Sequence, residues 1–238
     1  MKNILIIGGA KGIGQAMAQC YLNQGHQLIS TSRQYKHCDL KQNHLYCDLN
    51  QQESIATAFE LIRAKFKHID VLINCAAVLH TDHYQPEKSL KRVKQDHLIH
   101  NYQVNAIGHL LVLNHAEKLL SRAKQAVAVS ISARIGSIED NHLGGWYAYR
   151  MSKAALNMGI KTLSIEWHRK HPHIQFILLH PGTTDTALSK PFQKRLPQGQ
   201  LQTADETAAM MIEQIEKNQQ HSHKEALFLD YAGQTIPW

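Results

Sequence analysis

A tyrosine and a lysine form the pair of side chains in this chain best suited to catalysis. Tyr149 and Lys153 belong to the run Tyr-Arg-Met-Ser-Lys, whose spacing of four residues puts both side chains on one face of a helix. A phenol can give a proton to a reacting oxygen, but its ordinary pKa of about 10 is too high for easy exchange near neutrality. A nearby ammonium group stabilises a phenolate, so this spacing brings together two side chains that are able to do acid–base chemistry.

A second Tyr-x-x-x-Lys run extends from Tyr84 to Lys88. Pro86 lies inside it and its neighbours are polar, so this run is predicted to be a surface turn. Tyr149 instead stands at the start of a predicted helix that follows a predicted strand, which is where a site residue belongs in an α/β fold.

A glycine-rich turn near the amino end predicts a phosphate-binding site. The apolar run 3–7 passes directly into Gly8-Gly-Ala-Lys-Gly-Ile-Gly14. Gly8 permits a tight turn, Gly12 lets the backbone approach a pyrophosphate, and Gly14 lets the following helix lie close to the sheet. The start of that helix presents unpaired N–H groups and a positive dipole end. The turn therefore predicts a dinucleotide ligand.

Two cations indicate which dinucleotide is preferred. The second predicted strand ends at Ser32-Arg33, about 20 residues past the turn, where an NAD-binding protein places an acid. Arg33 supplies a planar cation suited to a phosphate, and Lys11 in the turn can reach the same group. Together they favour NADP(H) over NAD(H), although either residue taken singly can be an ordinary surface cation.

Strands and helices alternate along the whole chain. This order predicts an α/β fold: a single Rossmann-fold domain over residues 1–238, with a doubly wound parallel sheet of about seven strands and helices on both faces. A ligand is then expected at the carboxyl ends of the strands. The expected strands are 3–7, 26–32, 45–49, 70–74, 126–131, 175–179 and 226–229, and the expected helices are 12–24, 50–67, 99–122, 146–170 and 204–217.

Two segments lack a clear period. A polar insertion at 79–95 and a proline-containing stretch at 183–202, predicted to be a loop or lid, are expected to shape the substrate pocket. Their conformations do not follow from composition.

Composition narrows the class of protein. There is no linker-like tract, the first apolar run is too short for a signal peptide, and no apolar run approaches the roughly 20 residues that span a bilayer. We therefore expect a soluble, cytoplasmic protein that does not act at a membrane. The four cysteines show no CxxC spacing, which indicates reduced, buried or inert thiols at Cys20, Cys38, Cys47 and Cys75.

Charge and histidine content suggest two other functions, and neither is favoured. The net charge of +7 is spread along the chain without a nucleic-acid motif, so specific nucleic-acid binding is not expected and the charge better suits a polyanionic cofactor. Seventeen histidines raise the possibility of a metal site, but none stands in a recognisable ligand spacing. Solvated histidines and no metal are the prediction.

Along its whole length the chain resembles the short-chain dehydrogenase/reductase family. The family's glycine turn, adenine-contacting Asp, Asn-Asn-Ala-Gly element, helical Asn, Tyr and Lys, and Pro-Gly turn appear in order. The matching residues are Gly8, Gly12, Gly14, Asp48 with Leu49, Asn74-Cys75-Ala76-Ala77 (two of four positions depart), Asn105, Tyr149, Lys153 and Pro181-Gly182 with Thr186. The segments 136–149 and 228–238 look like the branch that contains C-factor and the sniffer-type carbonyl reductases.

The resemblance implies an NADP(H)-dependent carbonyl reductase acting on an aldehyde, ketone or quinone. Tyr149 would donate the proton, Lys153 would support it and hold the nicotinamide ribose, and Asn105 would position Lys153 through a water-linked path. The implied cofactor-binding residues are Gly8, Lys11, Gly12, Ile13, Gly14, Arg33, Asp48, Leu49, Asn74, Ala76, Tyr149, Lys153, Pro181, Gly182 and Thr186.

One expected catalytic residue is missing. The resemblance implies a serine three residues before Gly136, where this chain has Ala133. Ser132 is our first candidate to replace it, provided that a local bend turns it inward, and Ser137 is the second. The substitution keeps open an alternative function, a dinucleotide-binding signalling or regulatory protein of the C-factor type with little or no turnover.

The family's mode of association suggests a further expectation. The helices predicted at 99–122 and 146–170 resemble those through which family members associate, which implies a homodimer or homotetramer. Alternatively, the sheet alone covers their apolar positions.

Overall fold

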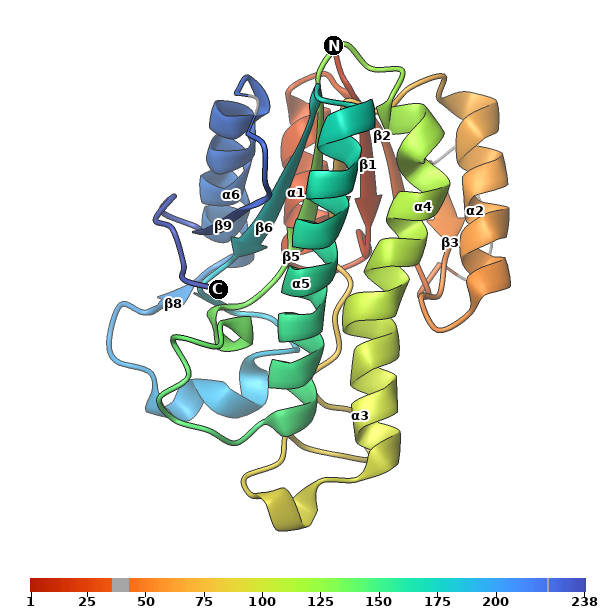
Figure 1. Cartoon of the computed structure of the whole chain (residues 1–238). Coiled ribbons are helices and arrows are strands. Elements are labelled where there is room, and N and C mark those ends of the chain that lie inside the picture. The colour runs from red at the N-terminus through yellow and green to blue at the C-terminus, as the bar shows by residue number, and fades with distance from the viewer. Residues whose placement is uncertain (36–42, 222) are drawn as a thin grey trace.

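Seven parallel strands form the centre of the fold, as predicted (Figure 1). The computed structural model describes residues 1–35, 43–221 and 223–238. The sheet has the order β3-β2-β1-β4-β5-β6-β9, so the direction of winding reverses between β1 and β4. Its strands are β1 (Asn3–Ile7), β2 (Gln27–Ser32), β3 (His44–Tyr46), β4 (Val71–Asn74), β5 (Ala126–Ile131), β6 (Ile174–His180) and β9 (Leu227–Asp230).

Helices cover both faces of the sheet. One face carries α1 (Gly12–Asn23) and α6 (Ala204–Gln219), and the other carries α2 (Gln52–Lys65), α4 (Gly108–Leu120) and α5 (Tyr147–Lys170) (Figure 1). A strand buried on both faces needs apolar side chains at every position, which explains the unbroken apolar run of β1.

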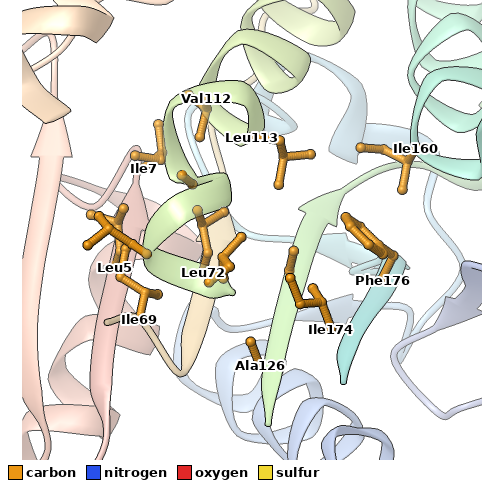
Figure 2. Packing of buried hydrophobic residues seen from close by; sticks show 14 of the residues in the cluster. Leu5, Ile7, Ile69, Leu72, Val112, Leu113, Ala126, Ile160, Ile174 and Phe176 are labelled. Carbon is orange, nitrogen blue, oxygen red and sulfur yellow. The ribbon is translucent and has the colours of Figure 1, made fainter. Parts of the chain in front are cut away.

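The side chains of β1 divide between two cores. Ile4 and Ile6 pack toward α1 and α6, whereas Leu5 and Ile7 join the larger core under α2, α4 and α5. In that larger core, Val112 and Leu113 of α4 face the strands, as Figure 2 shows. The two cores hold the strand ends, and with them the loops of the site, in fixed positions.

The helix predicted over 99–122 begins earlier and is interrupted. It comprises α3 (Gln95–Tyr102), a π-helical turn (Gln103–Ile107) and α4. A π turn adds a residue to the helical repeat, and the pattern of apolar residues does not reveal it. Gly108 follows the π turn. Only glycine fits at this position, because a Cβ there would lie 2.7 Å from the Cβ of Leu49.

The segment 183–202, expected as a loop or lid, contains short regular elements. Two-residue strands, β7 (Thr183–Thr184) and β8 (Leu201–Gln202), pair with each other, and a 3-10 helix (Lys190–Arg195) lies between them. Further 3-10 turns occur at Leu90–Arg92 and Arg134–Gly136. The segment 183–202 and the turn after β5 lie on the side of the sheet where the strands end (Figure 1).

The prediction of a surface turn at Tyr84 to Lys88 was right in part: the segment is irregular and Gln85 and Lys88 are exposed, but Tyr84 is only partly exposed and Glu87 is buried. The Tyr84 hydroxyl accepts from Asn101 Nδ2 and lies 3.0 Å from His100 Nδ1, while the Glu87 side chain is buried at 3 % exposure. Polar residues here are paired with helices far away in the sequence, so a polar composition did not mean a solvated segment.

The sequence also led to expectations about cysteines, membrane-spanning helices and metal ligands. Cys20 and Cys75 are free thiols, Cys47 is buried, and Cys38 lies outside the described residues. Among the described helices, none has the length and apolar character needed to cross a membrane. No group of three potential metal ligands was found within the described part of the chain.

Candidate active site

The glycine turn forms a cradle at the end of β1. Gly8 and Gly12 have φ values of 84° and 56°, which favour glycine. A Cβ on Gly14 would lie 2.3 Å from the Gly8 carbonyl oxygen, and one on Gly8 would lie 2.9 Å from the Ala76 nitrogen. The three backbone segments therefore approach as closely as only glycine allows, and all three line one cleft.

The cleft, of about 740 Å³, brings together most of the predicted site residues. It runs along the carboxyl edge of the sheet between the glycine turn and the segment 183–202, and Thr186 lies 3.2 Å from the position of a Cβ on Gly12. The predicted residues that line it are Gly8, Lys11, Gly12, Ile13, Gly14, Arg33, Asp48, Leu49, Ala76, Ser132, Tyr149, Lys153, Pro181, Gly182 and Thr186.

Asn74 and Asp48 shape the turns beside the cleft through their side chains. Asn74 is buried behind the cleft, and its Oδ1 accepts a hydrogen bond of 3.1 Å from the Ala76 nitrogen. Asp48 Oδ1 accepts from the backbone nitrogen and from Nδ2 of Asn50, both at 3.0 Å. Each residue fixes the backbone that follows a strand.

Tyr149 and Lys153 lie one turn apart at the start of α5, as predicted. Both are buried, and the Lys153 Nζ donates to the Ile131 carbonyl at 2.7 Å and lies 5.8 Å from the centre of the Tyr149 ring. Burial lowers the pKa of Lys153 to about 7 and raises the pKa of Tyr149. The pKa of the Tyr149 hydroxyl is thus set by burial rather than by the neighbouring ammonium, and the hydroxyl keeps its proton.

Asn105 contacts a loop rather than Lys153. In the π turn, its Oδ1 accepts from the Val78 nitrogen and its Nδ2 donates to the Val78 carbonyl, both at 2.8 Å. Nδ2 also donates to Ser152 Oγ at 2.9 Å, beside Lys153 in α5. The side chain of Asn105 therefore connects the loop after β4 to α5, the helix that carries Tyr149 and Lys153.

His109 is a further buried residue of this network that the sequence analysis did not identify. Its Nε2 lies 3.0 Å from the Ala76 carbonyl and its Nδ1 lies 3.1 Å from Ser130 Oγ. A carbonyl only accepts, so Nε2 donates to Ala76 and Nδ1 accepts from Ser130. Burial lowers the pKa of His109 to about 3, which contradicts the prediction that the histidines are solvated. The sequence did contain one signal for His109: it stands four residues after Asn105, a spacing that puts both side chains on one face of a helix.

Ser132 does not replace the missing serine. Its Oγ is buried and donates to Asn157 Oδ1 at 2.6 Å, so the strand alternation holds and the expected inward bend is absent. Ser137 Oγ donates to the Trp238 carbonyl at 3.3 Å and accepts from the Asp140 nitrogen. Ala133 instead packs against Tyr149.

An apolar wall surrounds the Tyr149 hydroxyl end of the cleft. Phe192 lies between Trp146 and His80, with ring centres 4.8 Å and 5.7 Å away. The His80 Nε2 lies 3.1 Å from the Leu188 carbonyl and joins the insertion to the segment 183–202. Sequence analysis missed this wall because its residues come from separate loops: Leu79, Ala133, Ile135, Trp146, Leu188 and Phe192.

Glu87 caps the amino end of α5, although it lies far from that helix along the chain. The N-cap residue of α5, Trp146, has φ of 53° and makes no side-chain cap. Glu87 Oε2 instead accepts from the Ala148 nitrogen at 3.2 Å, and the Glu87 carbonyl accepts from the Trp146 nitrogen at 2.5 Å. A carboxylate at a helix amino end satisfies free N–H groups and the dipole, so the insertion anchors the turn that bears Tyr149.

We predict that Glu87→Ala lowers the free energy of unfolding by about 1–2 kcal/mol, the usual cost of a lost cap. Glu87→Gln keeps an acceptor and should cost less. Urea unfolding measures both changes, and hydrogen exchange at the Ala148 amide should accelerate in the alanine variant. Unchanged exchange at Ala148 would contradict the capping role.

Lys153 also makes stability depend on pH. Its pKa in the folded protein, about 7, lies below its unfolded value of 10.5, so between these values the unfolded chain binds more protons. Stability contributed by this group therefore rises with pH across that window. Denaturant unfolding should show a smaller rise from pH 7 to 10 in Lys153→Met than in the wild type. The exposed-site control Lys170→Met should follow the wild type, and identical slopes for Lys153→Met and wild type would refute the prediction.

Comparison with known proteins places this site in a family. A family model described as short chain dehydrogenase matches residues 2–197. C-signal of Myxococcus xanthus is 32 % identical over 171 residues, which are 71 % of this chain and 93 % of that protein. The carbonyl reductase Sniffer of Drosophila melanogaster is 25 % identical with a TM-score of 0.84, and all of both chains is covered.

A third comparison supports the fold alone. An NADPH-bound carbonyl reductase from chicken fatty liver is 24 % identical with a TM-score of 0.82, covering all of this chain and 94 % of that one. The family match spans the glycine turn, Tyr149 and Lys153, and it ends within the segment 183–202. The chain is therefore an oxidoreductase of the short-chain dehydrogenase/reductase family, with a Rossmann fold.

Proposed function

We propose that the protein reduces a carbonyl compound with NADPH, and that Tyr149 supplies the proton. The observation that carries this proposal is the buried Tyr149 hydroxyl, which burial keeps protonated at the apolar end of a cleft that begins at a phosphate-binding turn. A protonated phenol can donate to the oxygen of a carbonyl as negative charge develops there. This state of the tyrosine suits reduction.

The residues of the cleft fit a dinucleotide. The backbone cradle at Gly8, Gly12 and Gly14, where side chains would clash, suits the pyrophosphate, and buried Lys153 suits the hydroxyls of the nicotinamide ribose. Asp48 and Leu49 would lie at the adenine, and Pro181, Gly182 and Thr186 at the nicotinamide. When bound, the reduced dinucleotide supplies the hydride.

Arg33 and Lys11 support NADP(H) over NAD(H). Both are exposed side chains that line the cleft, after β2 and in the glycine turn. A guanidinium binds a phosphate through two hydrogen bonds, which suits the additional phosphate of NADP(H). The NADPH named for the chicken carbonyl reductase fits the same choice.

A regulatory dinucleotide-binding protein is the second candidate. It is favoured by one observation: Ala133 puts a methyl group beside Tyr149, and the neighbouring hydroxyls of Ser132 and Ser137 are engaged elsewhere. The similarity to C-signal is compatible with it. NADPH binding without oxidation across a broad panel of carbonyl compounds would favour this candidate.

An exposed apolar stripe supports self-association. Met151, Met158 and Ile165 recur every seven residues on α5 and are 57 %, 65 % and 40 % exposed, and Ile99 and Tyr102 of the adjacent α3 are also exposed. Large apolar side chains at this spacing suit a second helix pair. We propose a homodimer that associates through this face. We also propose that the protein is cytoplasmic, where the thiols of Cys20 and Cys75 would stay reduced.

Tyr149→Phe should lower NADPH oxidation with a carbonyl substrate by about 10²–10⁴-fold, because it removes the proton donor. The dissociation constant for NADPH, measured by fluorescence, should stay within about threefold, since the ring and backbone remain. Tyr147→Phe is the matched control and should keep full activity. Turnover near the wild-type rate in Tyr149→Phe would refute the role.

Arg33→Ala should weaken NADPH binding by about 10–100-fold, the effect of losing hydrogen bonds to a charged group, and should leave NADH binding nearly unchanged. Calorimetric titration with both dinucleotides measures this difference. Arg92→Ala removes an exposed arginine outside the cleft lining and should change neither affinity. Equal losses for both dinucleotides would exclude a phosphate-specific contact.

Met158→Glu should convert a dimer into a monomer, because it puts a charge in the centre of the stripe. Light scattering coupled to size-exclusion chromatography gives the mass. Leu22→Glu, at an exposed position of α1 on the other face, is the control and should remain dimeric. A monomeric wild type would contradict the proposed interface.

A further inference from the structure

The two ends of the cleft differ in the chemistry that they offer. Lys11, Arg33 and Asp48 follow β1, β2 and β3, whereas the wall follows β4, β5 and β6. Adjacent strands lie about 4.8 Å apart, so β2 and β5, three positions apart in the sheet, are separated by roughly 14 Å. Charge is therefore concentrated at the cofactor end, and the substrate end is apolar.

Around Tyr149 the wall contains aliphatic and aromatic side chains. Leu79, Ala133 and Tyr149 form the buried part, and Ile135, Trp146, Leu188 and Phe192 pack against them. Trp146 meets Tyr149 at 6.5 Å between ring centres with an angle of 67°. An aromatic substrate could pack against such side chains edge to face or offset-stacked, the arrangements that aromatic rings prefer. A charged substituent brought against this wall would lose its hydration without gaining a partner.

The wall also offers few hydrogen-bond donors for a carbonyl oxygen. Position 133 carries a methyl group, and the hydroxyls on either side along the chain are committed, Ser132 to Asn157 and Ser137 to Trp238. Among the described wall residues and Tyr149, the Tyr149 hydroxyl and the weaker indole N–H of Trp146 are the side-chain donors.

Few donors leave developing charge poorly stabilised. As hydride reaches a carbonyl carbon, negative charge grows on the oxygen, and losing one donor at such a position costs about 10²–10³ in rate. A substrate that withdraws this charge into its own substituents depends less on the missing donor. The site should then select carbonyls by their intrinsic reactivity as well as by their shape.

We propose, on the basis of the carbonyl reductase function above, that the substrate is an uncharged aromatic carbonyl compound activated by an electron-withdrawing group. In the reaction the carbonyl carbon gains a C–H bond by taking hydride, with two electrons, from the reduced dinucleotide, which becomes oxidised. The carbonyl oxygen takes the proton of the Tyr149 hydroxyl, and solvent returns a proton to the phenolate. Ala133 is the residue that sets the requirement for activation.

The test uses para-substituted benzaldehydes ranging from methoxy to nitro, with NADPH and the full-length protein. For the wild type, kcat/KM should rise steeply with electron withdrawal, under conditions where a deuterated cofactor confirms that hydride transfer limits the rate. Ala133→Ser adds a hydroxyl next to Tyr149 and should flatten the dependence, with a gain of about tenfold or more for the methoxy compound and less for the nitro compound. A flat wild-type dependence, or parallel dependences in both proteins, would overturn the proposal.

Matched controls separate this effect from general changes in the cleft. Ala187→Ser adds a hydroxyl to an exposed residue of the cleft lining outside the wall, and its dependence should match that of the wild type. Trp146→Phe should steepen the dependence because it removes the indole donor. For the charged 4-carboxybenzaldehyde, kcat/KM should be at least tenfold lower than the dependence on electron withdrawal in the uncharged series predicts. A kcat/KM that agrees with that dependence would overturn the claim that the substrate is uncharged.

Binding distinguishes failure of this inference from failure of the proposed function. If neither the wild type nor Ala133→Ser oxidises NADPH with any member of the series while aliphatic aldehydes, ketones or quinones are reduced, this inference is overturned and the reductase function stands. If no carbonyl compound of any class is reduced, the reductase function is refuted. The wall is then judged by tryptophan fluorescence, in which 4-nitrobenzaldehyde should quench the wild type much more than Trp146→Phe, and 4-carboxybenzaldehyde should quench neither. Equal quenching in the two proteins, or none, would overturn the aromatic site as well.

Discussion

A parallel sheet must be covered on both faces, and this constraint determines where the protein can place chemistry. Every crossover helix returns the chain to the same end of the next strand, so all the loops that follow strands meet at one edge. The glycine turn after β1, Arg33 after β2 and Ala133 after β5 all reach that edge in this way. The cleft is thus a consequence of topology, and the loops only determine its chemistry.

The loop after β4 connects the part of the cleft at the glycine turn with the part that contains Tyr149. Ala76 touches the glycine turn and is held by His109, and Val78 is held by Asn105 through both its backbone polar groups. Asn105 and His109 lie four residues apart in a helix widened by a π turn, which brings both side chains to the same loop. A shift of the glycine turn would therefore be felt at α5 through hydrogen bonds to buried groups.

Electrostatics divide the cleft as clearly as topology does. The exposed cations Lys11 and Arg33 line the cleft near the glycine turn, buried Lys153 donates to the Ile131 carbonyl, and the wall beside Tyr149 is apolar. Burial acts in opposite directions on Lys153 and Tyr149 but favours the uncharged form of both. A bound dinucleotide would add negative charge and hydroxyl partners beside Lys153, so we expect its binding to favour the protonated form of Lys153.

The sequence by itself determined the fold class, the sheet of seven strands, the glycine turn after the first strand and the pairing of Tyr149 with Lys153 on one helix face. These features depend on local signals: apolar runs, glycine spacing and the helical repeat act between residues close along the chain. Only the tertiary structure decided the direction of the Ser132 hydroxyl, the cap that Glu87 provides 61 residues away from Ala148, the burial of His109 and the apolar wall. Each of these depends on which distant segments pack together, and a polar residue in a loop looks the same in sequence whether its partner is water or a buried helix end.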